Sequence, residues 1–209
     1  MRCCSWSGSY TRAIFSAVNQ SFPAVISCSG ISIIVLAILI GPLFSPAEFS
    51  WLQHSTSEQA GQGMSGAWVM RIGFIGYGAA TLTAAIIDWG SRPFVRATLI
   101  LFGIGLLGTA TWSNASILPG LSSDIHEDWL HSVASGVVGT AFAGACAARL
   151  FAPGGTRRDL LAWGGLVVSV VFPLAMGAMP EFRGLIQRVM FGVSFVFVAR
   201  EFVYPHFKQ

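Results

Sequence analysis

The residues best able to do chemistry are concentrated in one short stretch of the chain, residues 122–136. Three carboxylates and two histidines fall within eight consecutive residues there, whereas charged residues make up only 10% of the whole chain. If the stretch is helical, Asp124, Asp128 and His131 follow one another at helical spacing and lie on one stripe, which Ser135 continues. A carboxylate beside an imidazole stabilises the protonated ring or orients a neutral ring for a metal. Acidic residues also stabilise the first turn of a helix through its dipole, so a structural role for the carboxylates is the alternative.

Two arginines inside apolar runs are further candidates. Arg71 lies about seven residues into its run and Arg188 about six, which puts them roughly 10 Å and 9 Å deep at about 1.5 Å per residue. We expect both to share that depth with His131 and to pair with nearby carboxylates, because a charge inside a membrane must reach water or find a partner. The cluster is either a salt-bridge network that holds the helices together or a solvent-open pocket, and the sequence narrowly favours the network. The expected partners are Glu58, Asp124, Glu127, Asp128 and Glu181.

The composition indicates that these residues belong to a membrane protein. The chain has 209 residues, of which 54% are hydrophobic, and its mean hydropathy is +0.67. Soluble domains usually carry about 25% charged residues, so we expect the lipid bilayer of a cell membrane to surround most of this chain. The net charge of +3 is small and no basic run with interleaved aromatic residues occurs, which argues against nucleic acid as a partner.

The apolar runs predict an all-α fold, a polytopic transmembrane bundle of six helices. Residues 1–21 are expected to form a cytoplasmic N-terminal head, and residues 22–205 a single transmembrane domain. The first apolar run is too long for the apolar core of a signal peptide, so we expect a retained anchor. The predicted spans are about 23–44, 64–87, 94–113, 130–151, 160–179 and 182–204.

The distribution of Lys and Arg predicts that both termini are cytoplasmic. With six spans, the side opposite the termini keeps Arg183, with Arg71 and Arg188 just inside the membrane. The other cations fall on the side of the termini: Arg2, Arg12, Arg92, Arg96, Arg149, Arg157, Arg158, Arg200 and Lys208. Six tryptophans lie near predicted span ends, as an aromatic belt at the membrane surface requires: Trp51, Trp68, Trp89, Trp112, Trp129 and Trp163.

Small residues in the predicted spans are expected to bring helices close together. Two glycine-rich runs, GFIGYG at residues 73–78 and FGIGLLG at residues 102–108, have this character. They lie inside apolar spans rather than between a strand and a helix, so they are not phosphate-binding loops. A stripe of small residues at a spacing of four is expected to pack in the same way: Ser132, Gly136, Thr140, Gly144 and Ala148.

Three short motifs resemble a widespread prokaryotic membrane family known as DUF998, whose function is uncharacterised. The motifs are Ser57-Glu58 before a helix with Arg71, Gly73 and Phe74, an acidic loop with Asp124 leading to His131, and a closing run with Gly184, Gln187 and Arg188. The resemblance spans about residues 25–203 and implies six helices but no reaction. The approach to His131 is denser and more acidic than expected, so either Asp124 or Asp128 matches the acid of the family.

The family is also distantly similar to the superfamily of alkaline ceramidases and adiponectin-receptor-like proteins. There, histidines, an aspartate and a serine hold zinc for the hydrolysis of lipid amides. This similarity implies His126, His131 and Asp128 (or Asp124) as metal ligands here. The superfamily uses three histidines from different helices, whereas the remaining histidine on the predicted outer side is His54, in a loop.

Three kinds of function are compatible with these patterns, and no catalytic residue is assigned. The favoured hypothesis is a non-enzymatic integral membrane protein without a cofactor, an accessory subunit in a membrane-protein complex or a ligand-binding module. The first alternative is a zinc-dependent membrane hydrolase acting on a lipid-like substrate, which needs three converging ligands and an open position. A proton-coupled transporter that uses His131 is the weaker alternative, because no charged residue lies near the bilayer centre, where coupling sites usually lie.

Overall fold

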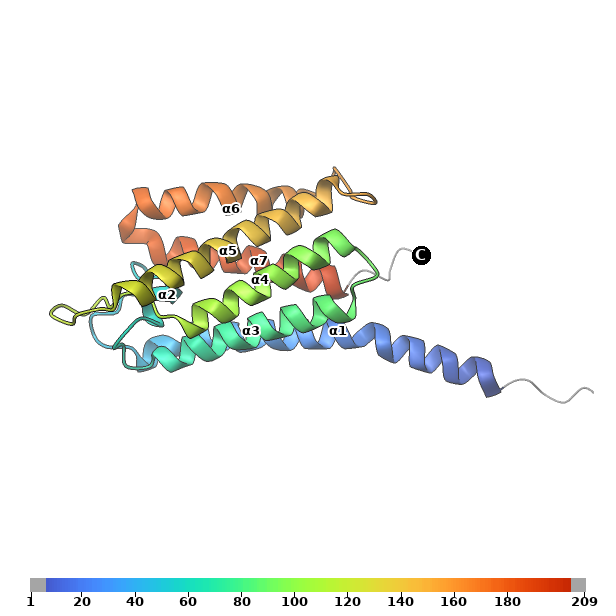
Figure 1. The fold of residues 1–209 in the computed structure, drawn as a ribbon, viewed down its shortest axis with the longest axis horizontal. Coiled ribbons are helices and arrows are strands. Elements are labelled where there is room, and N and C mark those ends of the chain that lie inside the picture. Colours follow the sequence, from blue (N-terminus) through green and yellow to red (C-terminus); the bar gives the residue numbers. More distant parts are fainter. Residues whose placement is uncertain (1–6, 204–209) are drawn as a thin grey trace, which may run out of the picture.

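The computed structural model describes the backbone of residues 7–203 and the side chains of residues 21–203. Within these residues every regular element is a helix and there is no strand (Figure 1). The elements are α1 (Ser7–Ile40), η1 (Gly41–Phe44), α2 (Thr56–Gln59), α3 (Ala67–Ile87), α4 (Pro93–Thr111), α5 (Ile125–Phe151), α6 (Leu160–Ala178), η2 (Pro180–Phe182) and α7 (Arg183–Val203).

Six helical segments are long and apolar enough to cross a membrane, which confirms the predicted fold class. They are Ser21–Phe44, Ala67–Ile87, Pro93–Thr111, Ile125–Phe151, Leu160–Ala178 and Pro180–Val203. The first helix is longer than its span, because α1 begins at Ser7, inside the region predicted to be a polar head. Three cations that entered the orientation prediction, Arg2, Arg12 and Lys208, lie outside the described side chains.

The six long helices form a ring in which each one packs on the next. α1 packs on α3, α3 on α4, α4 on α5, α5 on α6 and α6 on α7, and α7 closes the ring against α1. In Figure 1 the first turns of α1 project beyond the rest of the bundle, and α7 ends on that same side. A chain with an even number of spans begins and ends on the same side of the bundle.

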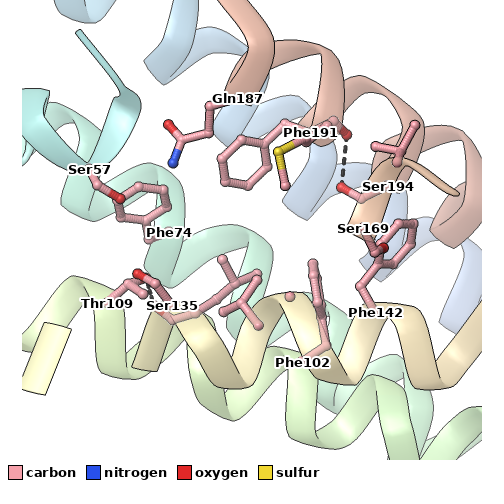
Figure 2. A pocket seen from close by; sticks show the side chains of 15 residues that line it. Ser57, Phe74, Phe102, Thr109, Ser135, Phe142, Ser169, Gln187, Phe191 and Ser194 are labelled. Atoms are coloured by element: carbon pink, nitrogen blue, oxygen red, sulfur yellow. Dashed lines mark hydrogen bonds between the residues drawn. The ribbon is translucent and has the colours of Figure 1, made fainter. Parts of the chain in front are cut away.

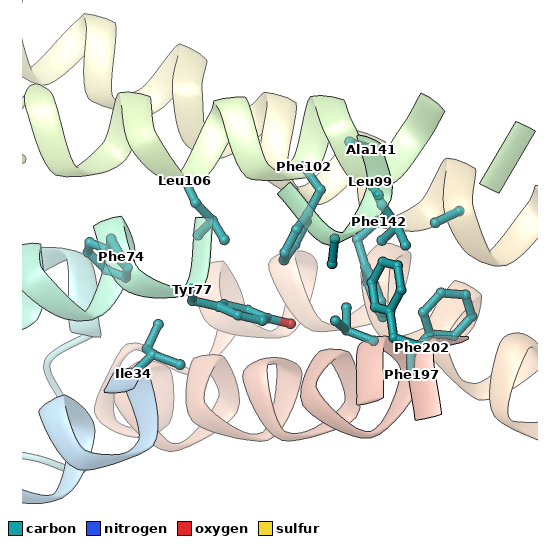
Figure 3. Packing of buried hydrophobic residues seen from close by; sticks show 14 of the residues in the cluster. Ile34, Phe74, Tyr77, Leu99, Phe102, Leu106, Ala141, Phe142, Phe197 and Phe202 are labelled. Atoms are coloured by element: carbon teal, nitrogen blue, oxygen red, sulfur yellow. The ribbon is translucent and has the colours of Figure 1, made fainter. Parts of the chain in front are cut away.

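Aromatic side chains pack together in the middle of the helix bundle (Figure 3). The ring of Tyr77 on α3 is fully buried and meets the rings of Phe102 and Phe195 edge to face, at centroid distances of 5.5 Å and 5.2 Å. Its phenol oxygen lies 3.2 Å from the hydroxyl of Ser194 on α7, so the one polar atom of this core residue has a partner. Tyr77 thus joins α3, α4 and α7 at the centre of the bundle.

Glycines bring α3 and α4 into close contact, as predicted from the two glycine-rich runs. A Cβ added at Gly103 would lie 2.7 Å from the carbonyl oxygen of Gly78, and one added at Gly78 would lie 2.9 Å from the carbonyl oxygen of Gly103. The two backbones can approach this closely only because neither residue has a side chain.

α5 contacts α4 through a different face from the predicted stripe of small residues. A Cβ added at Gly136 would meet nothing within 4 Å, and Thr140 is exposed. The prediction that the stripe packs closely against another helix is therefore wrong for Gly136 and Thr140. The contact uses Ala134 and Val138, which pack against glycines of α4. Because α4 already supplies the small residues, α5 can present larger apolar ones.

The bundle has two polar ends of opposite charge. The acidic end comprises residues 45–66, 112–124 and 179–182 with the adjoining helix turns, and the arginine-rich end comprises residues 88–92 and 152–159 with theirs. Among the described side chains, the acidic end carries Arg71, Arg183 and Arg188 against Glu48, Glu58, Asp124, Glu127, Asp128 and Glu181. The arginine-rich end carries Arg92, Arg96, Arg149, Arg157, Arg158 and Arg200 against Asp88, Asp159 and Glu201. All six tryptophans near the span ends are exposed, as an aromatic belt requires.

Candidate functional site

A short helix that the sequence analysis missed organises one side of the acidic end. α2 begins with a capping box, in which Glu58 N donates to Ser55 Oγ at 3.0 Å and Ser55 N donates to Glu58 Oε2 at 2.7 Å. The pattern Ser-x-x-Glu is the sequence signal for this start. The second oxygen of Glu58 accepts from Arg183 Nη1 at 2.7 Å, which ties α2 to the start of α7.

Arg188 fastens the preceding loop to α7. Its side chain is only 7% exposed, and Nη1 donates to the carbonyl oxygens of Trp51 at 2.8 Å and of His54 at 3.0 Å. The guanidinium also lies 4.4 Å above the ring of Trp51, which adds a cation–π contact. A Cβ at Gly184, one turn earlier, would collide with both carbonyl oxygens, so glycine is required where the loop crosses α7.

The carboxylates of the acidic stretch hold the other side of this end. Asp124 caps α5 by accepting from the backbone N–H groups of the two residues that follow Ile125. Glu127 accepts from Ser113 N at 2.8 Å, and Asp128 accepts from Ala115 N at 2.7 Å. Each carboxylate therefore satisfies backbone groups at the start of α5 or in the loop that leads to it, as the structural alternative proposed.

The predicted ion pairs between the two membrane arginines and these carboxylates do not form. Arg71 donates to Ala60 O at 3.4 Å and to the hydroxyl of Ser113, and Arg188 donates to loop carbonyls. Within the described side chains, the ion pair at this end joins Glu58 to Arg183. The reason is that the folded loops place carbonyl oxygens next to both arginines, closer than any carboxylate.

The acidic end thus contains two clamps. In one, Glu58–Arg183 and Arg188 hold loop 45–66 on α7. In the other, Asp124, Glu127 and Asp128 hold loop 112–124 on α5. Arg71 joins the two loops through Ala60 and Ser113.

His131 lies between these clamps. One nitrogen of its ring is held by a hydrogen bond, and the other has no hydrogen-bond partner among the described residues. The side chain is 2% exposed, and Nδ1 lies 2.8 Å from the carbonyl oxygen of Trp112. A carbonyl oxygen can only accept, so Nδ1 carries the hydrogen and Nε2 of the neutral ring is an acceptor. Nε2 is buried and has no hydrogen-bond partner among the described residues.

The structure does not bring the other predicted metal ligands to His131. His126 is exposed and stacks on Trp129 at a centroid distance of 6.1 Å, and His54 Nδ1 accepts from Ser50 N at 2.8 Å. Asp128 is occupied by the loop backbone. In residues 21–203 no group of three His, Cys, Asp or Glu side chains is placed to hold a metal ion.

A polar cavity of about 300 Å³, which we call the vestibule, opens between the two clamps. Of the residues singled out from the sequence as site candidates, Glu58 and His131 line it. Their neighbours are Arg183 and Gln187 from α7, Ser57 from α2 and Ser135 from α5. The charged side chains that line the vestibule, Glu58 and Arg183, form an ion pair and neutralise each other.

A second, apolar cavity of about 110 Å³ lies deeper, in the middle of the bundle (Figure 2). Four aromatic rings line it, Phe74 from α3, Phe102 from α4, Phe142 from α5 and Phe191 from α7, together with Val168 and Ser169 of α6. We call it the inner cavity.

Three polar residues line both cavities and therefore lie between them: Ser57, Ser135 and Gln187. We call these three residues the neck. Gln187 Oε1 accepts from Thr56 N at 2.6 Å and from Thr56 Oγ1 at 2.7 Å, which fixes the orientation of the amide. Its NH₂ group must then point away from α2, and in Figure 2 it points into the cavity. All three residues belong to the sequence motifs described above, but they lie far apart in the chain and only the fold places them together.

Comparison with known proteins gives one match. A family model described as "Protein of unknown function (DUF998)" matches residues 28–200, which is most of the chain. No curated protein and no solved structure gives a significant match. None of these comparisons supports the expected similarity to alkaline ceramidases.

Proposed function

The chain belongs to the DUF998 family, whose function is unknown, and we propose that this member is a membrane-embedded binding protein for a neutral, lipid-like molecule. One observation carries the proposal: a polar cavity at the acidic end and an apolar cavity inside the bundle share three lining residues, so the two lie next to each other. An amphipathic molecule has the same two parts in the same order. We further propose that the protein lies in a cell membrane with its arginine-rich end on the cytoplasmic side, following the Lys and Arg distribution.

The polar groups of the neck and vestibule suit an uncharged head group that carries a hydroxyl. Such a hydroxyl can donate to Nε2 of His131, a buried acceptor that lacks a partner among the described residues, and can accept from the amide NH₂ of Gln187. Leaving a buried acceptor unpaired costs about 1–3 kcal/mol, so a donor there is favourable. An anionic head group has no free cation to meet, because Arg183 is paired with Glu58.

The inner cavity suits a hydrocarbon segment. Its walls are mostly aromatic and aliphatic, and an apolar cavity of about 150 Å³ in another protein binds benzene. A cavity of about 110 Å³ can therefore hold a short part of an alkyl or isoprenoid chain. The structural role predicted from the sequence remains part of this proposal, since the two clamps fix the walls of the vestibule.

No observation favours the zinc hydrolase in the same way. His131 is the one described histidine that lines the vestibule, and a catalytic zinc needs three protein ligands.

A matched pair of glycine variants on α5 tests the proposal. Gly139 lines the inner cavity, and a Cβ added there meets nothing within 4 Å, so Gly139→Leu adds a bulky side chain at the cavity wall where its first atom has room. Gly136 has equal space but does not line the cavity, so Gly136→Leu is the control. The probe is a monoacylglycerol with a photoreactive diazirine in its acyl chain, added to the full-length protein in nanodiscs.

We expect the probe to label residues of α5 and α7 that line the inner cavity. Gly139→Leu should reduce this labelling by about tenfold or more, and unlabelled monooleoylglycerol should compete with it. Equal labelling of both variants, or labelling confined to the outer surfaces of the helices, would show that the cavity does not bind the chain.

A further inference from the structure

The arginine-rich end contains a buried ion network that the sequence analysis read only as an orientation signal. At its centre is Glu201 of α7, which is 1% exposed. Its Oε2 lies 3.0 Å from Arg92 Nη1 and 3.5 Å from Arg96 Nη1. Its Oε1 lies 3.6 Å from Arg149 Nε and 3.6 Å from Arg200 Nη2. Four guanidinium groups from α5, α7 and the start of α4 thus surround one carboxylate.

Two further carboxylates join the network without balancing it. Asp88 accepts from Arg96 Nε at 2.9 Å, and Asp159 accepts from Arg149 Nε at 2.8 Å and from Arg200 Nη1 at 2.6 Å. Four arginines therefore face three carboxylates. The network therefore carries a surplus of one positive charge, and its most exposed member is Arg92 at the surface.

Several buried guanidinium donors of the network make no hydrogen bond to any described residue: Arg96 Nη1, Arg149 Nη1 and Arg200 Nη2. Two of them, Arg96 Nη1 and Arg200 Nη2, still lie 3.5 Å and 3.6 Å from the carboxylate of Glu201, whereas Arg149 Nη1 has no such ion-pair contact within residues 21–203. Arg96 is completely buried and lies 4.4 Å above the ring of Phe202. The network thus has one more positive than negative charge, and Arg149 keeps a donor without a hydrogen bond that an anion could use.

A small groove leads from the surface to this network. It lies between the start of α4 and the end of α5, and Arg92 and Arg149 line it together with Ala152 and the Pro153–Gly155 turn. Its volume of about 20 Å³ accommodates one water-sized group, such as a single phosphate oxygen. The side chain of Arg92 is 36% exposed, so the remaining oxygens of a phosphate could stay at the surface beside it.

The groove opens where two candidate membrane spans end, at the start of α4 and the end of α5. Phe94 and Phe151, next to it in the chain, are 59% and 54% exposed, as expected of side chains that face lipid tails. Trp163, whose indole N–H donates to Arg157 O at 3.0 Å, marks the same level. Arg157 and Arg158 are exposed in the same loop and add positive charge around the opening.

We propose that this groove binds a phosphate group, supplied by the head group of an anionic phospholipid. The phosphate would accept from Arg92 and Arg149 and offset the surplus charge around Glu201, while the acyl chains would lie against the exposed apolar rim of α4 and α5. Basic pockets between membrane helices bind anionic head groups in this way. The site is at the opposite end from the vestibule and does not depend on the proposed function.

Thermal unfolding of the full-length protein in nanodiscs tests the site. The discs contain phosphatidylcholine alone or phosphatidylcholine with phosphatidylglycerol, and a third sample has phosphatidylcholine with inorganic phosphate in the buffer. A ligand present at about a hundred times its Kd should raise the midpoint by about 5 °C or more in a chain of this length. Relative to phosphatidylcholine alone, we expect this rise with phosphatidylglycerol and not with inorganic phosphate.

Three variants decide whether the groove is responsible. Arg92→Gln removes a phosphate ligand, and Ala152→Leu fills the groove while leaving every charge in place. Both should lose the shift that phosphatidylglycerol produces. Arg158→Gln removes one positive charge from loop 152–159, outside the groove. This variant should keep the shift that phosphatidylglycerol produces. An equal shift in all three variants would assign the effect to the general surface charge and overturn the site. A shift of the same size with inorganic phosphate would overturn the lipid as the source.

Discussion

Replacing Glu201 with Gln should destabilise the whole arginine-rich end. At an effective dielectric constant of about 20, a charge pair separated by 3.0–3.6 Å is worth roughly 5 kcal/mol before desolvation and repulsion are subtracted. Glu201 makes four such pairs, and repulsion between the arginines cancels much of the sum. Removal of one partner from a buried ion pair typically costs about 3–5 kcal/mol, because the other charge is left uncompensated. Glu201→Gln leaves four arginines against two carboxylates, so we expect a loss at the upper end of that range.

The assay can use a thiol that is already inside the bundle. Cys146 on α5 is fully buried, and a thiol-reactive dye would label it only on unfolding. The substitutions Cys3→Ser, Cys4→Ser and Cys28→Ser would remove the other thiols. A loss of about 4 kcal/mol should lower the midpoint by roughly 10 °C at this chain length.

Two comparisons make the result interpretable. Glu181→Gln removes an exposed carboxylate at the acidic end and should leave the midpoint within about 2 °C of the unaltered protein. The double variant Glu201→Gln with Arg92→Gln restores part of the charge balance and should recover part of the loss. A midpoint for Glu201→Gln as high as that of Glu181→Gln would refute the view that this network is buried and essential.

Two more outcomes are expected. Burial alone would raise the pKa of Asp159, but hydrogen bonds from two arginines and from a backbone N–H hold it at about 2, below the usual 3.8. Its stabilising contribution should therefore be complete above about pH 4 and disappear as the pH falls toward 2, and Asp159→Asn should remove this acid-dependent part from a series of unfolding midpoints. At the α3–α4 contact, Gly103→Ala should cost about 1–3 kcal/mol because the new Cβ meets the carbonyl oxygen of Gly78. Gly192→Ala, where a Cβ meets nothing within 4 Å, should be neutral or stabilising in the same unfolding assay.

The long helices could be predicted from the sequence because the bilayer fixes their length and composition. The fourth span is predicted to begin at about residue 130, whereas α5 begins at Ile125, because Asp124 caps the helix and the acidic residues that follow belong to its first turn. This start agrees with the alternative drawn from the sequence, in which the acidic stretch opens a helix.

Partner choice could not be predicted in the same way. Arg71 and Arg188 were matched to carboxylates by depth, but they bind backbone oxygens and a hydroxyl that loops 45–66 and 112–124 deliver. The position of such oxygens depends on how the loops fold, which local sequence does not specify. The buried network was missed for a different reason. Glu201, an acid inside a membrane span, was the available signal, but the residues around it come from separate helices.

The opposite charges of the two ends also have an electrical consequence. Counted over the side chains of residues 21–203, one end has three net positive charges and the other three net negative charges, so this part of the bundle is a dipole aligned with the membrane normal. Each elementary charge that crosses a potential of 100 mV exchanges about 2.3 kcal/mol with the field. Turning the folded bundle over in an energised membrane would therefore cost up to roughly 14 kcal/mol. The membrane potential itself would hold the arginine-rich end on the negative side for the lifetime of the protein.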